Sequence, residues 1–131
     1  MNLRGMANAS YWAADWAAAR EWYTELVGYP PYFERPGYAE WRLGDDQDEL
    51  GLIDARYRPA GVTPGAGVVL HWHTDDVAAM YERLLALGAT ALEGPQDRGA
   101  GFVTASVVDP FGNVFGIIYS PHYAAIKGEA S

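Results

Sequence analysis

The chain has 131 residues, a net charge of −8 and no cysteine, and half of its residues are hydrophobic. This composition is typical of one folded domain; it excludes disulfides, thiolate nucleophiles and thiolate metal ligands, and it opposes binding to nucleic-acid phosphates. The beginning of the chain lacks an apolar signal region and no stretch reaches the length of a membrane helix, so we expect a cytoplasmic protein with no nucleic-acid or membrane partner.

The first half of the chain predicts a strand, a helix and further strands. Residues 6–12 form a strand-like run, and Asp15 and Gly28 mark the beginning and end of an amphipathic helix with apolar residues at helical spacing. Residues 38–43 alternate with period two, and 50–53 follow after a turn, as expected for two strands. The prolines before this alternating run confine their segment to an edge strand or a loop.

The second half of the chain repeats this order. A strand at 68–73 precedes an amphipathic helix that begins at Asp76 and ends at Gly88. The runs 102–108 and 114–119 flank a Pro- and Gly-containing turn and predict a hairpin. Because neither half has enough apolar surface to be stable alone, we expect the two halves to pack together.

The whole chain, 1–131, is therefore predicted to be a single domain of two modules. Module 1 covers about 6–58 and module 2 about 67–120. The segment between them, about 59–66, is a linker, because its prolines and glycines interrupt both helical and strand patterns. Residues 121–131 are a C-terminal tail.

Three short motifs occur in order along the chain: Asp15 through Trp22-Tyr23 to Gly28, Asp75-Asp76 through Leu84 to Gly88, and the turn Asp109–Asn113. Together they resemble the vicinal oxygen chelate superfamily, which includes glyoxalase I, extradiol dioxygenases and bleomycin-resistance-type binding proteins. The resemblance spans about residues 6–120. It implies an α+β fold in which two βαβββ modules form one domain, with a cupped mixed sheet around a cavity.

In the enzymes of that superfamily, the first and last strands of each module carry the ligands of a metal ion. The resemblance places these four positions on Asn8, Gly51, Val69 and Gly116. None of them offers the imidazole or carboxylate that a divalent ion requires, so we predict no metal, no cofactor and no catalytic residue. The two glycines, which stand where bulky ligands are usual, are expected to widen the cavity.

His71 and His73 are the pair that could restore a metal site, because residues two apart point to the same face of a strand. A metal-dependent lyase or dioxygenase of the glyoxalase type, using this shifted site, is the alternative to a metal-free protein. A metal-independent enzyme with a histidine as general base is a third possibility. No nucleophile motif accompanies Ser10, Thr104 or Ser106.

The strand faces that would hold a metal in an enzyme are expected to line the cavity of a binding protein. Five Trp and nine Tyr supply flat rings that can stack on a planar ligand. Since metal-free members of the superfamily sequester aromatic antibiotics as homodimers, the resemblance implies a non-catalytic homodimer. Its ligand would be a planar aromatic small molecule, able to carry a positive charge, such as an antibiotic, and sequestration would confer resistance. The predicted ligand-binding residues are Asn8, Ser10, Trp12, Tyr38, Trp41, Val69, His71, His73, Phe102, Gly116 and Ile118.

Overall fold

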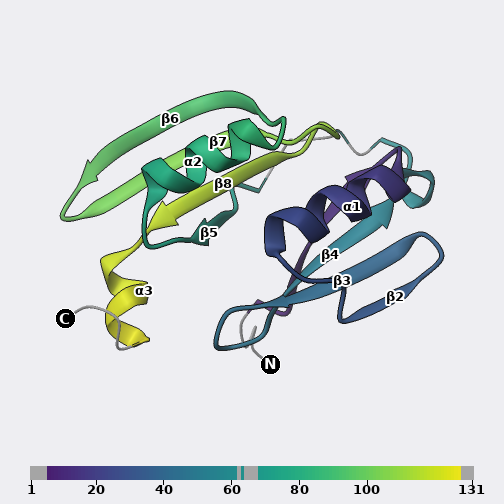
Figure 1. Cartoon of the computed structure of the whole chain (residues 1–131), viewed down its shortest axis with the longest axis horizontal. Helices are drawn as coiled ribbons and strands as arrows, with labels where there is room; N and C mark the ends of the chain where they lie inside the picture. Colours follow the sequence, from purple (N-terminus) through teal and green to yellow (C-terminus); the bar gives the residue numbers. More distant parts are fainter. Residues whose placement is uncertain (1–5, 62, 64–67, 128–131) are drawn as a thin grey trace. The chain divides into compact units, whose positions relative to one another are not determined.

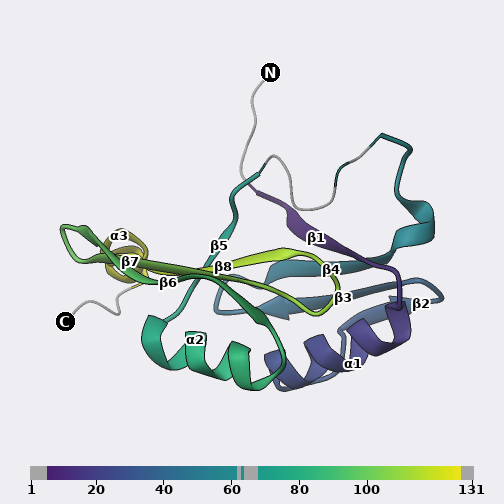
Figure 2. The same cartoon turned by 90° about the horizontal axis from the view of Figure 1, so that it is seen from above.

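The computed structural model describes residues 6–61, 63 and 68–127. The chain forms two compact units, one on either side of the junction between Pro64 and Gly65. Each unit is a four-stranded mixed sheet with a helix on one face (Figures 1 and 2). This is the α+β class that the sequence predicts. Among the described residues, no helix combines the length and the apolar character needed to cross a membrane.

The first unit follows the predicted order of a strand, a helix and three further strands. Its sheet has the order β1-β4-β3-β2, with β1 parallel to β4 and the remaining pairs antiparallel. A short 3-10 helix, η1, ends the unit. The elements are β1 (Asn8–Ala13), α1 (Trp16–Val27), β2 (Phe33–Arg35), β3 (Tyr38–Leu43), β4 (Asp48–Asp54) and η1 (Ala55–Tyr57).

Both ends of α1 lie at the residues that the sequence indicates. The Asp15 side chain accepts a hydrogen bond from the Ala18 N–H at 3.1 Å, which satisfies one of the unpaired donors of the first turn. Gly28 ends the helix in the left-handed conformation, with φ of 96°. The helix is thus bounded by local chemistry, and packing then decides which of its faces is buried.

The core of the first unit is aromatic. Tyr23 of α1 is fully buried, with its ring centroid 5.8 Å from that of Tyr11 and 6.2 Å from that of Trp41. Leu50 and Leu52 of β4 are fully buried too. Burying a side chain of this kind contributes roughly 1.5–3 kcal/mol, so these few residues supply much of the stability of the unit.

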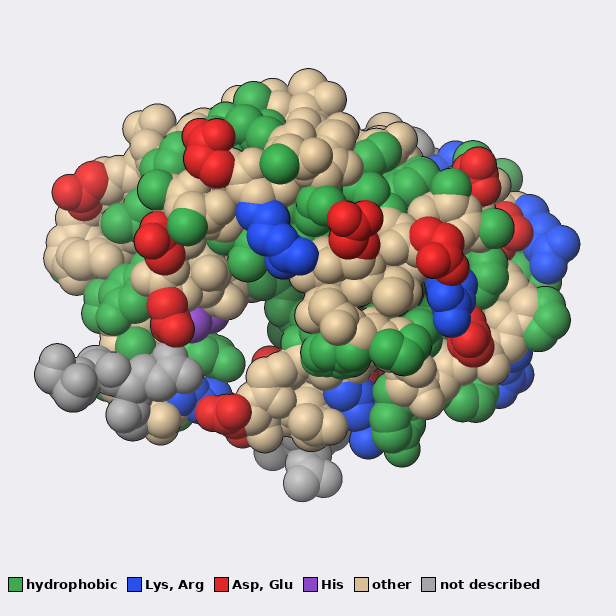
Figure 3. Space-filling view, viewed as in Figure 1, with side chains coloured by type: hydrophobic (Ala, Val, Ile, Leu, Met, Phe, Trp, Pro, Cys, Tyr) green, Lys and Arg blue, Asp and Glu red, His purple; other side chains and the backbone are tan. Residues whose placement is uncertain are grey.

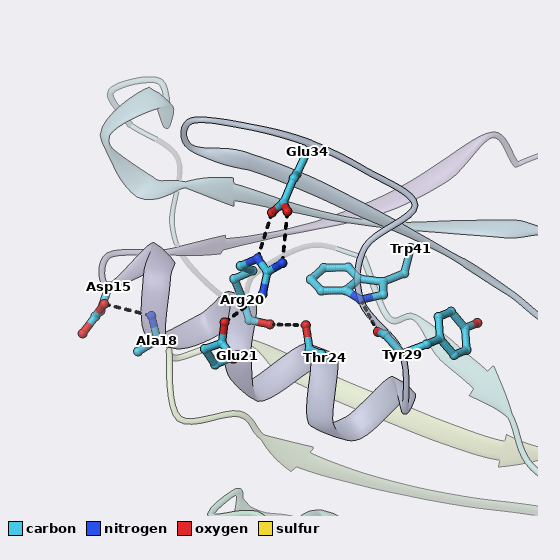
Figure 4. A network of polar contacts seen from close by, with 8 residues as sticks. All are labelled: Asp15, Ala18, Arg20, Glu21, Thr24, Tyr29, Glu34 and Trp41. Carbon is cyan, nitrogen blue, oxygen red and sulfur yellow. Dashed lines mark hydrogen bonds and ion pairs between the residues drawn. The ribbon is translucent and has the colours of Figure 1, made fainter.

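An ion pair connects α1 to the edge strand β2. Arg20 contacts Glu34 through two parallel bonds, Nε to Oε2 at 2.8 Å and Nη2 to Oε1 at 3.0 Å (Figure 4). All three residues of β2 are exposed, so apolar burial contributes little to holding this strand. We conclude that the Arg20–Glu34 pair, together with the ladder to β3, fixes β2 in place.

The second unit repeats the architecture and adds a terminal helix. Its sheet has the order β5-β8-β7-β6, with β5 parallel to β8. The Asp76 side chain accepts from the Ala79 N–H at 3.0 Å and begins α2 as Asp15 begins α1. The elements are β5 (His71–His73), α2 (Val77–Ala86), β6 (Thr90–Gly99), β7 (Phe102–Val108), β8 (Val114–Tyr119) and α3 (Pro121–Ile126).

Two elements of the second unit lack a clear local pattern. Strand β6 is almost entirely exposed, contains Gly94 and Pro95, and pairs with β7 through several register shifts, so it shows no alternation. Helix α3 occupies the segment that the sequence suggests is a tail, and Ser120 caps it by accepting from the Tyr123 N–H. Strand β5 is also shorter than predicted and begins at His71.

Candidate functional site

Each sheet packs one face against its long helix, α1 or α2, and the side chains of each strand alternate between this face and the opposite one. On β1 the helix side carries Tyr11 and Ala13, both buried, and the other side carries Asn8, Ser10 and Trp12. The strand register extends this face across the first sheet. Its members, called face 1, are Asn8, Ser10, Trp12, Phe33, Arg35, Tyr38, Glu40, Arg42, Glu49, Gly51 and Ile53.

The second sheet has an equivalent face. His71 pairs with Gly116, which pairs in turn with Ser106, and His73 pairs with Ile118 and so with Thr104. Buried Ala105, Val107, Phe115 and Ile117 lie on the opposite, helix-covered side. The members of this face, called face 2, are His71, His73, Glu93, Arg98, Phe102, Thr104, Ser106, Gly116 and Ile118.

Gly51 and Gly116, which the resemblance places at metal-ligand positions, hold equivalent places in the two units. Gly51 pairs with Ser10 and Gly116 with His71, so the register of the repeat is the same in both. A Cβ on Gly51 would lie 2.6 Å from Ser10 Oγ, and a Cβ on Gly116 would lie 2.9 Å from His71 Cδ2. The expectation that these glycines widen a cavity is therefore wrong, because the side chains of Ser10 and His71 already cover them.

Face 1 combines aromatic rings with carboxylates. The rings of Phe33 and Tyr38 lie 6.3 Å apart, and the Tyr38 hydroxyl donates to Glu40 Oε2 at 2.9 Å. Burial, and next the hydrogen bond to Glu40, raise the pKa of Tyr38 to about 12. Tyr38 therefore remains a neutral phenol at pH 7, and it holds the Glu40 carboxylate in one orientation.

A second charged pair lies further along face 1. Arg42 Nη2 lies 3.8 Å from Glu49 Oε2, and the Arg42 guanidinium lies over the Tyr32 ring at 3.7 Å from its centroid. Both side chains of the pair are about one third exposed. Arg42 thus offsets Glu49. Arg35, whose guanidinium carbon lies 5.1 Å from the centroid of the Phe33 ring, adds a second positive charge, so the two carboxylates of the face are matched by two arginines.

Face 2 is polar and carries a half-buried histidine. Arg98 Nε donates to Thr104 Oγ1 at 2.9 Å, and Arg98 Nη2 donates to Glu93 Oε1 at 2.5 Å. Burial, and next the charge of Arg98, lower the pKa of His71, while Glu93 acts in the opposite sense. His71 is therefore a neutral imidazole at pH 7, with one nitrogen that donates and one that accepts.

His73 has a structural role beside this cluster. Its Nδ1 accepts from the Ser120 N–H at 3.2 Å, and its ring stacks on Tyr123 with centroids 4.4 Å apart. Nε2 lies 3.6 Å from Asp75 Oδ1. The ring thus anchors the beginning of α3, and Nδ1 is occupied by a backbone hydrogen bond. Within the described part of either unit, no three His, Asp or Glu side chains are grouped as metal ligands would be.

The structure separates the predicted site residues into three sets. Trp41 is fully buried against Tyr23, and its Nε1 donates to the Tyr29 carbonyl at 3.1 Å, so it belongs to the core of unit 1 and not to face 1 (Figure 4). Val69 precedes β5 and is 78% exposed. The remaining residues lie on the two named faces: Asn8, Ser10, Trp12 and Tyr38 on face 1, and His71, His73, Phe102, Gly116 and Ile118 on face 2.

Sequence reasoning missed most of the charged residues on these faces. Glu40 and Arg42 share the alternation of Tyr38, so the period-two pattern of β3 could have identified them. Glu49 lies opposite Asn8 across the β1–β4 pair. Glu93 and Arg98 lie on the irregular strand β6, where no alternation signals which side chains face Thr104.

Comparison with known proteins identifies the family. The family model described as the glyoxalase-like domain matches residues 8–118. The chain belongs to the glyoxalase-like domain family. The vicinal oxygen chelate superfamily that the motifs resemble is thereby confirmed, and the two repeated units are the expected architecture of a glyoxalase-like protein. No curated protein sequence matches the chain.

Solved structures show the same glyoxalase-like fold. A glyoxalase-related enzyme from Fulvimarina pelagi is 23% identical, with a TM-score of 0.73 over 91% of this chain and 90% of its own. A glyoxalase/bleomycin resistance protein/dioxygenase superfamily member from Sphaerobacter thermophilus is 20% identical, with a TM-score of 0.73 over 90% and 98%. A Burkholderia phytofirmans family enzyme is 19% identical, with a TM-score of 0.69 over 86% and 96%. At these identities the likeness establishes the fold alone.

Proposed function

We propose that this glyoxalase-like protein binds a planar aromatic small molecule without transforming it, and that it protects the cell by sequestering a compound such as an antibiotic. The observation that carries the proposal is the composition of face 1. Trp12, Phe33 and Tyr38 offer aromatic rings on the same sheet surface as the carboxylates of Glu40 and Glu49. Rings stack on planar ligands, and the two carboxylates, together with Arg35 and Arg42 on the same face, supply hydrogen-bonding groups around them.

The residues at the family's metal positions support binding over catalysis. Asn8 and Val69 lack strong ligand atoms, and Gly51 and Gly116 are each covered by a neighbouring side chain. Placing a carboxylate on Gly116 would push its Cβ into the Leu70 carbonyl oxygen and the His71 ring. The backbone around β8 is thus adapted to a residue without a side chain, not to a metal ligand.

The proposal is tested by ligand binding. Purified protein is titrated with bleomycins, enediynes and phenazines, followed by tryptophan fluorescence and thermal unfolding. At least one class is expected to stabilise the fold saturably, by about 2.7 kcal/mol at a concentration one hundred times its Kd. Trp12→Leu is expected to weaken binding about tenfold. Trp22→Leu is the matched control, since Trp22 is a half-buried indole on α1.

An equal loss of ligand affinity in Trp12→Leu and Trp22→Leu would show that the general stability of the protein, and not face 1, controls binding. Metal content and turnover of thiol adducts and catechols are measured on the same preparation. Bound metal and activity that both disappear in His71→Ala and His73→Ala would replace the proposal by the metal-dependent alternative. Failure of every aromatic ligand to stabilise the protein would also refute sequestration.

A further inference from the structure

The polar cluster on face 2 is distinct in chemistry from the aromatic face 1. It consists of His71, Glu93, Arg98, Thr104 and Ser106, which lie on three strands of one sheet. Arg98 is the single cation among the four strands of this sheet, and its bonds to Glu93 and Thr104 fix its guanidinium on the face. With His71 neutral, Arg98 and Glu93 balance, so the cluster as a whole carries no net charge at pH 7.

The position of the His71 ring follows from the absence of a side chain at Gly116. The ring lies over this glycine and so extends toward β7, where Ser106 is the next side chain in the row. Within the described part of its own unit, no hydrogen bond holds either ring nitrogen of His71, although the side chain is half-buried. These nitrogens are not among the fully buried, unpartnered side-chain atoms of the described residues, so they are open to solvent and available to a hydrogen-bonding group of a ligand.

The donors and acceptors of the cluster define what fits. The neutral imidazole offers an accepting nitrogen, and the fixed guanidinium offers N–H groups beyond those held by Glu93 and Thr104. A hydroxyl group matches the chemistry of both, because an O–H can donate to an imidazole nitrogen and its oxygen can accept from a guanidinium. A carboxylate has no proton to donate, and it is further opposed by Glu93 and by the net charge of −8.

We propose that His71 and Arg98 form a hydroxyl-recognition site, and that the aromatic ligand of this protein carries a phenolic or similar ring hydroxyl. The inference rests on the proposed binding function and narrows its ligand class to hydroxylated aromatics. Ile118, which pairs with His73 and Thr104 on the same face, provides an apolar surface for the ring that carries the hydroxyl. His71 and Arg98 act here as specificity residues, and no bond in the ligand is made or broken.

The test compares three naphthalenes that share one ring system. Isothermal titration calorimetry measures the affinity of the full-length protein for 2-naphthol, 2-methoxynaphthalene and 2-naphthoate. The wild type is expected to bind 2-naphthol about tenfold more tightly than the methoxy compound, because a lost hydrogen bond to a fixed partner costs about 1–1.5 kcal/mol. In His71→Phe and in Arg98→Gln this preference should disappear while the methoxy compound keeps its affinity. His122→Phe, which alters an exposed histidine outside the cluster, should retain the preference.

The possible outcomes separate this inference from the function on which it rests. Equal affinity for the naphthol and the methoxy compound would overturn the hydroxyl site and leave aromatic binding intact. Tightest binding of the naphthoate would overturn it too, in favour of an anion site at Arg98. Absence of binding by all three would refute both. Side-chain NMR of His71 provides a second readout, since 2-naphthol should shift the ring nitrogen resonances of His71 and the methoxy compound should not.

Discussion

At the scale of single residues, the two units differ in how tightly their equivalent glycines are enclosed. A Cβ on Gly51 would meet the Ser10 hydroxyl, a flexible side-chain atom, 2.6 Å away, and then only ordinary contacts such as Tyr38 Oη at 3.6 Å. A Cβ on Gly116 would meet the backbone carbonyl oxygen of Leu70 as well as the His71 ring. Side chains can rotate to relieve overlap and backbone cannot, so the two glycines should respond differently to substitution.

Gly116→Ala is therefore expected to cost about 2–3 kcal/mol of stability, and Gly51→Ala about 1 kcal/mol. Adding Ser10→Ala to Gly51→Ala should recover most of that loss, because the Ser10 Cβ lies at a tolerable 3.4 Å from the new methyl group. Urea unfolding of the wild type, the three variants and Ser10→Ala alone measures these differences. Equal costs at both glycines, or no recovery in the double variant, would contradict the proposed packing.

At the scale of elements, helix capping and edge-strand attachment are local and separable. Asp15 and Asp76 begin equivalent helices in the same way. Each side chain accepts a hydrogen bond from the backbone N–H of the residue three positions later. The edge strand β2 depends on an ion pair instead, and the Arg20 guanidinium, mainly through its hydrogen bonds, lowers the pKa of Glu34. Glu34 is 44% exposed, so solvent screens the pair and limits its worth to about 0.5 kcal/mol.

This ion pair predicts a small pH dependence with a defined sign. The pKa of Glu34 is lower in the folded protein than its value of 4.5 in the unfolded chain. The ion pair therefore contributes its full stabilisation above pH 4.5, and this stabilisation is lost as the pH falls through the folded-state pKa. Glu34→Gln should thus destabilise the protein by about 0.5 kcal/mol at pH 7 and by less at acid pH. Chemical denaturation at pH 7 and at an acid pH measures this difference in stability.

The control is Glu21→Gln, because the Glu21 carboxylate contacts the same arginine but is 72% exposed. A Glu34→Gln effect that is independent of pH would contradict an ionic origin.

At the scale of the whole molecule, the space-filling view shows one face, and it carries charges of both signs. Figure 3 shows acidic side chains distributed over the visible face, with basic and hydrophobic ones between them. Interspersed charges of both signs are typical of a solvent-facing protein surface. Large apolar side chains are exposed at several places along the described residues, and Val68 and Val69, just before β5, are the most exposed of them at 84% and 78%.

The predicted homodimer also concerns the whole molecule. Because exposed apolar side chains are stabilised by burial in an interface, we expect Val68 and Val69 to lie in the dimer interface. Light scattering after size-exclusion chromatography is expected to give the mass of two chains, and Val68→Asp combined with Val69→Asp should shift it toward one. A single-chain mass for the wild type at all concentrations tested would refute the dimer.

The sequence alone determined the features that arise from local chemistry. Both helices begin at the aspartates that the pattern indicates. Helix α1 ends at Gly28, whereas α2 is capped by Leu87, one residue before the left-handed Gly88. Strand β3 has the predicted bounds, because caps and period-two alternation are encoded in a few consecutive residues. The repeat and the three motifs likewise identified the superfamily. Strand β6 and helix α3 escaped prediction, because one is irregular and exposed and the other is held by His73 from a distant strand.

Only the tertiary structure decided which side chains share a surface. Trp41 and Tyr38 lie three residues apart on one strand, yet Trp41 is in the core and Tyr38 is on face 1, since the register assigns opposite faces to odd and even positions. Glu49, Glu93 and Arg98 reach the two faces through strand pairing with distant segments. Strand pairing also explains why Gly51 and Gly116 are enclosed. A side chain of the neighbouring strand, Ser10 or His71, occupies the space above each glycine.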